Sequence, residues 1–107
     1  MASINWDLIQ QRPVGEWLYF AIKANNEDLF QYVLDRKEEV TDDQAREGME
    51  IACTLGHIRF LRRMIEEEVG KPFGGLLSVA ILFKQFDIIS YLEKLGRTYD
   101  LDEKSPR

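Results

Sequence analysis

Cys53 and His57 are the residues of this chain whose types and spacing come closest to a chemical site. They lie four positions apart, so on one continuous helix they would share a face. A Cys–His pair there could act as a thiolate nucleophile or as half of a zinc site. However, Gly56 is expected to break the helix between them, and the chain contains one cysteine and one histidine. We therefore predict no disulfide, no metal site and no other cofactor.

Neighbouring carboxylates are a second candidate for chemistry. General acid–base catalysis needs two carboxylates that converge on one pocket with separated pKa values. The acidic clusters are instead expected at helix ends and in loops, where charge is solvated: Glu38-Glu39, Asp42-Asp43, Glu66-Glu67-Glu68, Asp100 and Asp102-Glu103. Gly74-Gly75 also lacks the Lys-Ser/Thr that completes a phosphate-binding loop. We predict that the protein is not an enzyme.

Three arginines, Arg59, Arg62 and Arg63, lie close together in the chain. They could bind an acidic partner. The alternative is that they are solvated or pair with Glu66 and Glu67 three or four residues further along the same helix. This alternative is the prediction that we adopt.

The balance of charge narrows the possible partners. Nineteen acidic and fourteen basic residues give a net charge of −5. This sign disfavours binding to nucleic acid and to anionic membranes. An acidic chain could instead mimic nucleic acid and so inhibit a DNA- or RNA-binding protein.

No signal peptide is recognisable, and the nearly uncharged run 73–83 is about half the length that spans a bilayer. We predict a cytoplasmic protein that is not secreted.

The elements that must position these residues repeat three times. When the segment 48–66 is shifted back by 31 residues, Ala52 falls on Ala21, and when it is shifted forward by 28, Ala52 falls on Ala80. Each unit is predicted to be two helices. Three signals for the start of the first helix recur at about the same spacing, namely Pro13 and Pro72 at a first helical position and a capping box at Thr41-Asp42-Asp43-Gln44.

The ends of the first helices are predicted at Asn25, Gly56 and Lys84, of which Lys84 suits the left-handed turn conformation least. Gly70 and Gly96 are expected to stop the second helices of units two and three. No segment shows β alternation. Helices are therefore expected at 4–11, 13–24, 27–37, 42–55, 58–69, 72–84 and 86–96. We predict one all-α domain over 1–96, with an N-terminal capping helix and a flexible, disordered polar tail over 97–107.

The middle unit resembles the helix pair of an ankyrin repeat. The resemblance is carried by Ile51-Ala52-Cys53, Gly56-His57 and the apolar positions Leu61 and Ile65, and it extends loosely over 14–96. It implies a short solenoid of about three ankyrin-like hairpins, with Cys53 as a small packing residue and His57 as the cap of the second helix.

The chain also departs from the ankyrin pattern. The family's Thr-Pro-Leu-His start is absent, the spacing is below 33, and Thr41 caps a helix where a β-hairpin finger would begin. A degenerate stack without fingers is expected. Such divergent stacks are similar to those of viral or bacterial host-interaction factors.

The resemblance also implies a partner-binding face. In ankyrin-like stacks the two residues before the first turn point to the concave face, here Lys23-Ala24, Thr54-Leu55 and Leu82-Phe83. Leu55, Leu82 and Phe83 would form an apolar stripe beside Lys23 and Thr54, and an exposed apolar patch marks an interaction site. The alternative is that, without fingers, these residues pack inside the fold.

The third unit is apolar on nearly all sides, whereas terminal repeats normally have a polar outer face. Phe86, Ile89 and Tyr91 are therefore candidates for a dimer or partner surface, unless the tail covers them. The function predicted is a non-enzymatic protein–protein interaction module, an adaptor or an inhibitor. The alternatives are a self-assembling homodimer of structural or regulatory role, and the acidic mimic described above.

Overall fold

The computed structural model describes residues 5–99, which form seven α-helices and one 3₁₀ turn with no β-strand in that range. The all-helical prediction is therefore confirmed for this part of the chain. In order, the elements are α1 (Trp6–Ile9), α2 (Val14–Lys23), α3 (Glu27–Leu34), η1 (Lys37–Glu39), α4 (Asp42–Leu55), α5 (Ile58–Glu66), α6 (Gly74–Leu82) and α7 (Phe86–Tyr99).

The starts of the helices follow local hydrogen bonding. The capping box predicted at the start of α4 is present, because the Thr41 hydroxyl accepts from the Gln44 N–H (3.1 Å) and the Gln44 side chain accepts from the Thr41 N–H (3.0 Å). The two prolines do not occupy the first helical position that the sequence suggested. Pro13 immediately precedes α2, and Pro72 is followed by Phe73 in an extended conformation before α6 begins.

The three turns between paired helices have the same geometry. Asn25, Gly56 and Lys84 all have positive φ, at 56°, 79° and 58°. The next N–H in each case donates to the carbonyl of the repeated alanine, Ala21, Ala52 or Ala80, at 2.8–2.9 Å. Lys84, the least suitable of the three residues, therefore still adopts the left-handed conformation that ends a helix.

The second helices differ from the sequence prediction at their C-terminal ends. Helix α3 ends at Leu34 rather than 37 and is followed by the separate turn η1. Helix α5 ends at Glu66 rather than 69, because Glu68 turns left-handed and the Val69 N–H donates to the Met64 carbonyl.

Helix α7 continues past Gly96 to Tyr99, so Gly96 is an interior residue of the helix and not its stop. The prediction that a tail begins at 97 is therefore wrong for the backbone of 97–99. The rest of the predicted tail, 100–107, lies outside the described residues.

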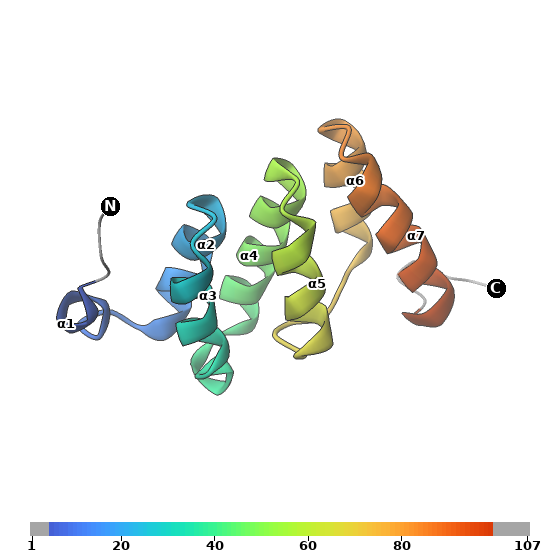
Figure 1. Ribbon diagram of the computed structural model, residues 1–107. Helices are drawn as coiled ribbons and strands as arrows, with labels where there is room; N and C mark the ends of the chain where they lie inside the picture. Colours follow the sequence, from blue (N-terminus) through green and yellow to red (C-terminus); the bar gives the residue numbers. More distant parts are fainter. Residues whose placement is uncertain (1–4, 100–107) are drawn as a thin grey trace.

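The three helix pairs stand side by side, with α2, α4 and α6 in one row and α3, α5 and α7 in the other (Figure 1). The first helices pack closely because Gly48 of α4 has no side chain. A Cβ at Gly48 would lie 2.9 Å from Leu18 Cδ2 and 3.4 Å from Ile22 Cδ1 of α2. In the second row, the Phe30 and Phe60 ring centroids are 4.5 Å apart. The core therefore runs along the row, between successive pairs.

Helix α1 packs on the α2 end of this row. The Trp17 indole N–H donates to the Ile9 carbonyl at 2.8 Å, and the side chains of Ile9 and Val14 are buried. The Trp6 ring lies 5.1 Å from the Tyr32 ring of α3. Helix α1 therefore contacts the first helix pair through Ile9 and Trp6.

Candidate interaction surface

The Cys53–His57 pair does not form a nucleophilic site. The Cys53 side chain is fully buried in α4, and burial, with a smaller contribution from the charge of Glu50, raises the pKa of its thiol to about 12. His57 lies beyond the Gly56 turn at the N-cap of α5, where its ring meets the Phe60 ring edge-on. His57 is thus at the cap position that the ankyrin resemblance implied, and its side chain makes no capping hydrogen bond there. A thiol with such a raised pKa stays protonated at neutral pH.

A surface hollow beside α4 and α5 is lined by side chains of both charges. It has a volume of about 870 Å³ and lies beside the start of α4 and the end of α5. Its charged side chains have both signs, namely Asp42, Arg46, Glu66, Glu68 and Lys71. Among residues 5–99 no three His, Cys, Asp or Glu side chains come together as metal ligands would.

The arginines contact side chains of neighbouring helices. Arg59 forms an ion pair with Glu27 of α3, Arg63 donates to the Gln31 side chain at 2.9 Å, and the Arg62 guanidinium lies 5.4 Å from the Tyr91 ring of α7. The ion pairs with Glu66 and Glu67 that the sequence suggested are not found, and Arg59 is largely exposed, as the prediction also allowed. The reason is that α3, α5 and α7 lie side by side, so that side chains about one repeat apart in the sequence come together.

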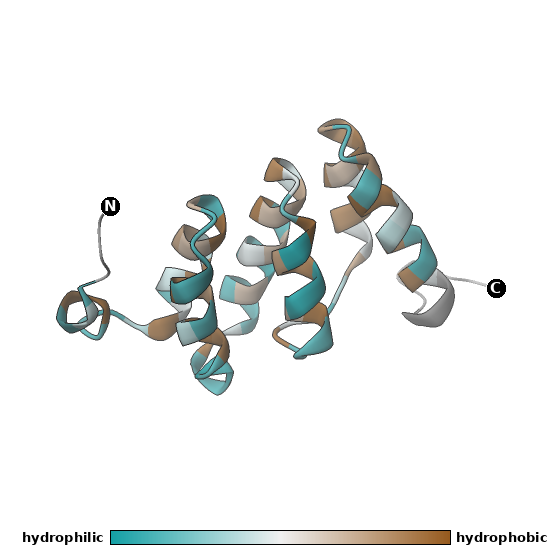
Figure 2. Cartoon of the chain, viewed as in Figure 1, coloured by the Kyte–Doolittle hydropathy of each residue, from teal (hydrophilic) through white to brown (hydrophobic). Residues whose placement is uncertain are grey.

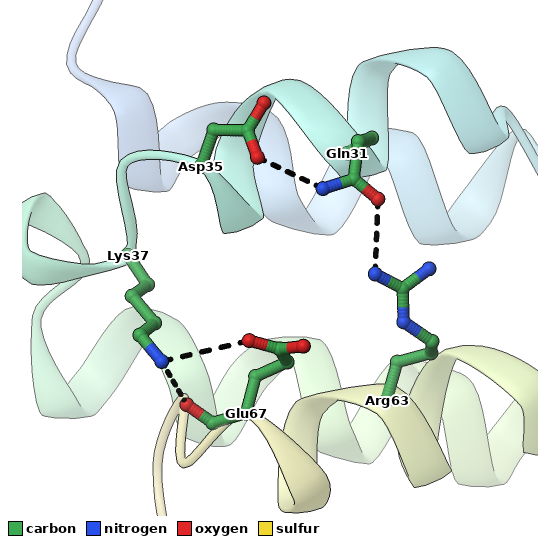
Figure 3. Close-up of polar contacts among 5 residues, drawn as sticks. All are labelled: Gln31, Asp35, Lys37, Arg63 and Glu67. Carbon is green, nitrogen blue, oxygen red and sulfur yellow. Dashed lines mark hydrogen bonds and ion pairs between the residues drawn. The ribbon is translucent and has the colours of Figure 1, made fainter.

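Figure 3 shows two groups of polar contacts on α3, α5 and the segments that follow them: Arg63 with Gln31 and Asp35, and Lys37 with Glu67. Gln31 also donates to Asp35 at 2.9 Å, and the Lys37 ammonium lies 2.7 Å from the Glu67 backbone carbonyl and 3.6 Å from its carboxylate. The outer side of α3 and α5 is therefore polar, and many of its charged groups already have partners within the chain.

The predicted partner-binding residues lie at the C-terminal ends of the first helices. Leu55, Leu82 and Phe83 expose 42%, 72% and 47% of their surface. Of the two possibilities open at the sequence level, exposure is therefore correct and packing inside the fold is wrong. The physical reason is helical geometry, since Leu82 lies about 200° around α6 from the fully buried Ala80.

The two polar members of the predicted site have different surroundings. Lys23 is exposed at the end of α2, with its ammonium 5.7 Å from the Tyr19 ring. Thr54 is half-buried, and its hydroxyl donates to the Glu50 carbonyl at 2.9 Å. The Thr54 carbonyl in turn accepts from the Gln85 side chain at 2.9 Å. Thr54 therefore holds the end of α4 against the α6–α7 turn.

The apolar part of this surface is concentrated on the second and third pairs. We call the exposed side chains of Leu55, Leu82, Phe83 and Phe86 the apolar edge. Figure 2 shows hydrophobic colour at the turn ends of α4 and α6. Phe86 is 70% exposed at the start of α7, next to the turn that carries Phe83. The sequence analysis named Phe86 as a candidate for a dimer or partner surface separate from Leu55, Leu82 and Phe83. Its position beside the turn that carries Phe83 is visible only in the fold.

Of the other two residues of the predicted dimer or partner surface, Ile89 lies on the same side of α7 as Phe86, three residues earlier, whereas Tyr91 lies about 140° around the helix from Phe86. Ile89 and Tyr91 are half-buried and pack against the core. Tyr91 is turned toward Arg62 of α5. Residues two positions apart in a helix point about 200° away from each other, so Ile89 and Tyr91 lie on different sides of α7. The apolar side chains Phe20 and Ile81 were not singled out as site residues and are both exposed, at 48% and 56%.

No family model, curated protein or solved structure matches this chain. Within residues 5–99, no helix combines the length and the apolar character that crossing a bilayer requires.

Proposed function

We propose that the protein is a non-enzymatic protein–protein interaction module, built from ankyrin-like helical hairpins, whose apolar edge binds an apolar segment of another protein. The observation that carries this proposal is the exposure of four large apolar side chains, Leu55, Leu82, Phe83 and Phe86, at adjoining helix ends. Contiguous exposed apolar side chains of this kind are typical of interaction sites.

The backbone holds these side chains in place before any partner binds. The left-handed turns at Gly56 and Lys84 fix the directions of Leu55 and Phe83. The hydrogen bond from the Gln85 side chain to the Thr54 carbonyl joins the two turns. A pre-arranged surface loses little conformational entropy on binding, so more of the gain from apolar burial is kept as affinity.

The chemistry of α6 suits a partner with apolar side chains. Its nine residues, Gly74–Leu82, contain no charged side chain. Covering this part of the surface therefore desolvates no charge, which would be costly without a partner. The expected ligand is an amphipathic helix or extended segment that presents Leu-, Met- or Phe-like side chains.

The test compares proteins captured by the immobilised wild-type chain with those captured by Leu82→Asp. Because burying one leucine contributes about 1.5–3 kcal/mol, the variant is expected to retain a specific partner about tenfold less, or worse. Leu82 is largely exposed, so the helical circular dichroism signal is expected to be unchanged.

Leu8→Asp is the matched control, because Leu8 is also exposed but lies on α1 at the other end of the row. It is expected to retain the partner as the wild type does. Equal capture by all three proteins would exclude the apolar edge as the binding surface. Loss of helicity in Leu82→Asp would show instead that this residue supports the fold.

A further inference from the structure

A lysine occupies the turn between Phe83 and Phe86 of the apolar edge, although the backbone there disfavours it. Lys84 has a φ of 58°, the left-handed conformation that Asn25 and Gly56 adopt with less strain at the equivalent turns. Its side chain is exposed, and among residues 5–99 its ammonium has no hydrogen-bond or ion-pair partner.

The turn itself gives no sufficient reason for a lysine at this position. The C-terminal end of α6 attracts a cation, but at an exposed site this attraction is smaller than the strain of the left-handed backbone. Residues held in such sparsely populated conformations are concentrated at functional sites. The reason for Lys84 is therefore to be sought in what its side chain binds.

A second lysine stands at the other end of the same line of helix ends. The ends of α2, α4 and α6 lie along one side of the row (Figure 1), and the equivalent positions there are Lys23, Thr54 and Leu82. Lys23 is exposed, and its ammonium lies 5.7 Å from the Tyr19 ring of its own helix. Neighbouring packed helices are about 8–10 Å apart. The two lysines therefore flank the apolar edge, roughly 16–20 Å from each other.

Most of the acidic residues behind the net charge of −5 are far from these lysines. The clusters lie at the opposite ends of the helices, namely Glu38-Glu39, Asp42-Asp43 and Glu66-Glu67-Glu68. Helix α4 has 14 residues and is therefore about 21 Å long. That length exceeds two Debye lengths at physiological salt, so exposed charges at the start of α4 are largely screened at its end.

Four carboxylates remain closer to the turns, namely Glu27, Asp28, Glu50 and Asp87. Glu27 forms an ion pair with Arg59. Asp28 and Asp87 stand in the first turns of α3 and α7, where the free N–H groups of a helix attract a carboxylate. Glu50 lies five residues before Leu55, about 140° around α4 from it. None of the four forms an ion pair with Lys23 or Lys84.

We infer that the segment bound by the apolar edge is acidic as well as apolar, with an Asp or Glu side chain that pairs with Lys84 and a second that pairs with Lys23. This inference rests on the proposed function and adds the charge of the partner to it. The Phe83 and Phe86 rings beside Lys84 exclude water once the segment is bound, which strengthens the ion pair. A basic segment with the same apolar residues places like charges together and is rejected.

The test is a selection of displayed random peptides of about 16 residues, long enough as a helix to reach both lysines, on the immobilised full-length chain. Affinities of the selected peptides are then measured by fluorescence anisotropy. Peptides on the apolar edge are those that Leu82→Asp weakens by about tenfold or more. Among these peptides, Asp and Glu are expected to outnumber Lys and Arg.

Two variants of Lys84 test the ion pair itself. Lys84→Glu is expected to weaken the acidic peptides about tenfold or more, because it places like charges together. Lys84→Gly removes the charge and suits the turn, so a loss of about two- to fivefold there does not come from misfolding. Both losses are expected to shrink at high salt. Lys71→Glu is the matched control, because Lys71 is exposed on the connection between α5 and α6.

The outcomes separate this inference from the proposed function. A selection that yields no peptide sensitive to Leu82→Asp would overturn the proposed function and the inference with it. Peptides that depend on Leu82 but show no excess of acidic residues, or that bind both Lys84 variants as tightly as the wild type, would overturn the inference alone. Equal losses with Lys71→Glu and Lys84→Glu would also overturn it, because the net charge of the chain would then explain the preference.

Discussion

The thiol of Cys53 shows how burial sets the chemistry of a single side chain. Its pKa rises from the ordinary value of 9.0 to about 12, first because burial disfavours the thiolate and second because Glu50 is negatively charged. Between these two values the folded chain keeps a proton that the unfolded chain has lost. The folded state is therefore favoured by this group below pH 9, and the contribution disappears as the pH rises toward 12.

We expect the free energy of unfolding to fall more steeply with pH above 9 in the wild type than in Cys53→Ala. The extra loss is about 1.4 kcal/mol per pH unit, because only the unfolded wild-type chain releases the thiol proton there. Urea unfolding between pH 8 and 10.5 measures it. Lysines and tyrosines titrate in both proteins and cancel in the difference. Parallel pH profiles would mean that the buried thiol ionises as readily as a free one.

At the scale of the helical elements, the turn between paired helices is the unit that recurs. Asn25, Gly56 and Lys84 adopt one conformation despite their different side chains. A left-handed residue with a Cβ is strained by about 1–2 kcal/mol. Lys84 therefore adopts a conformation that its own preferences oppose, because the packing of α6 against α7 requires the chain to reverse there.

Lys84→Gly is expected to stabilise the protein by about 0.5–1 kcal/mol, since relief of strain exceeds the added flexibility of the unfolded chain. Lys84→Ala keeps the strain and is expected to change stability little. The measurement is the midpoint of chemical unfolding at neutral pH. Equal effects of the two substitutions would indicate that the third turn is not strained.

Gly56→Ala is expected to act in the opposite direction. The added Cβ requires the strained left-handed conformation and would lie 2.6 Å from the Gln85 side-chain oxygen. We expect a loss of about 1–2 kcal/mol in the free energy of unfolding, measured by the same unfolding experiment. A loss well below that of Asn25→Ala, which adds no Cβ, would contradict the tight turn seen here.

At the scale of the whole molecule, stability comes from contacts between successive helix pairs. The row measures 50 × 27 × 18 Å, and its core follows the long direction. Leu18 and Leu77 occupy equivalent positions of the repeat, yet Leu18 is fully buried against α4 while Leu77 is only half-buried. Identical side chains in equivalent places thus have different numbers of neighbours.

Leu18→Ala is expected to cost about 2–5 kcal/mol, the range for a fully buried leucine. Leu77→Ala is expected to cost less than half as much, because Leu77 is only half-buried. Thermal or urea unfolding of the two variants provides the comparison. If both substitutions cost the same, then Leu77 is packed as closely as Leu18 and the difference in burial between the two positions is wrong.

How far the sequence predicts the site depends on the range of the interactions involved. The three alanines, the capping box at Thr41 and the turn at Gly56 act within a few residues, and the sequence placed all of them. The helix start predicted at Pro72 and the helix end predicted at Gly96 were wrong, because where a helix begins or ends also depends on what packs beside it. The partners of Arg59 and Arg63 lie about 30 residues away in the chain, beyond the reach of helical periodicity.

The sequence by itself determined that the fold of residues 5–99 is built from helices and that the helix pairs recur about every 30 residues, because hydrogen bonding and helical periodicity are local. Only the tertiary structure decided that Leu55 and Phe83 are exposed, that Phe86 joins them, and that Ile81 is open while its equivalents Ile22 and Cys53 are buried. Exposure depends on which neighbour stands on each side of a helix, and within residues 5–99 the third pair has a neighbouring pair on one side only.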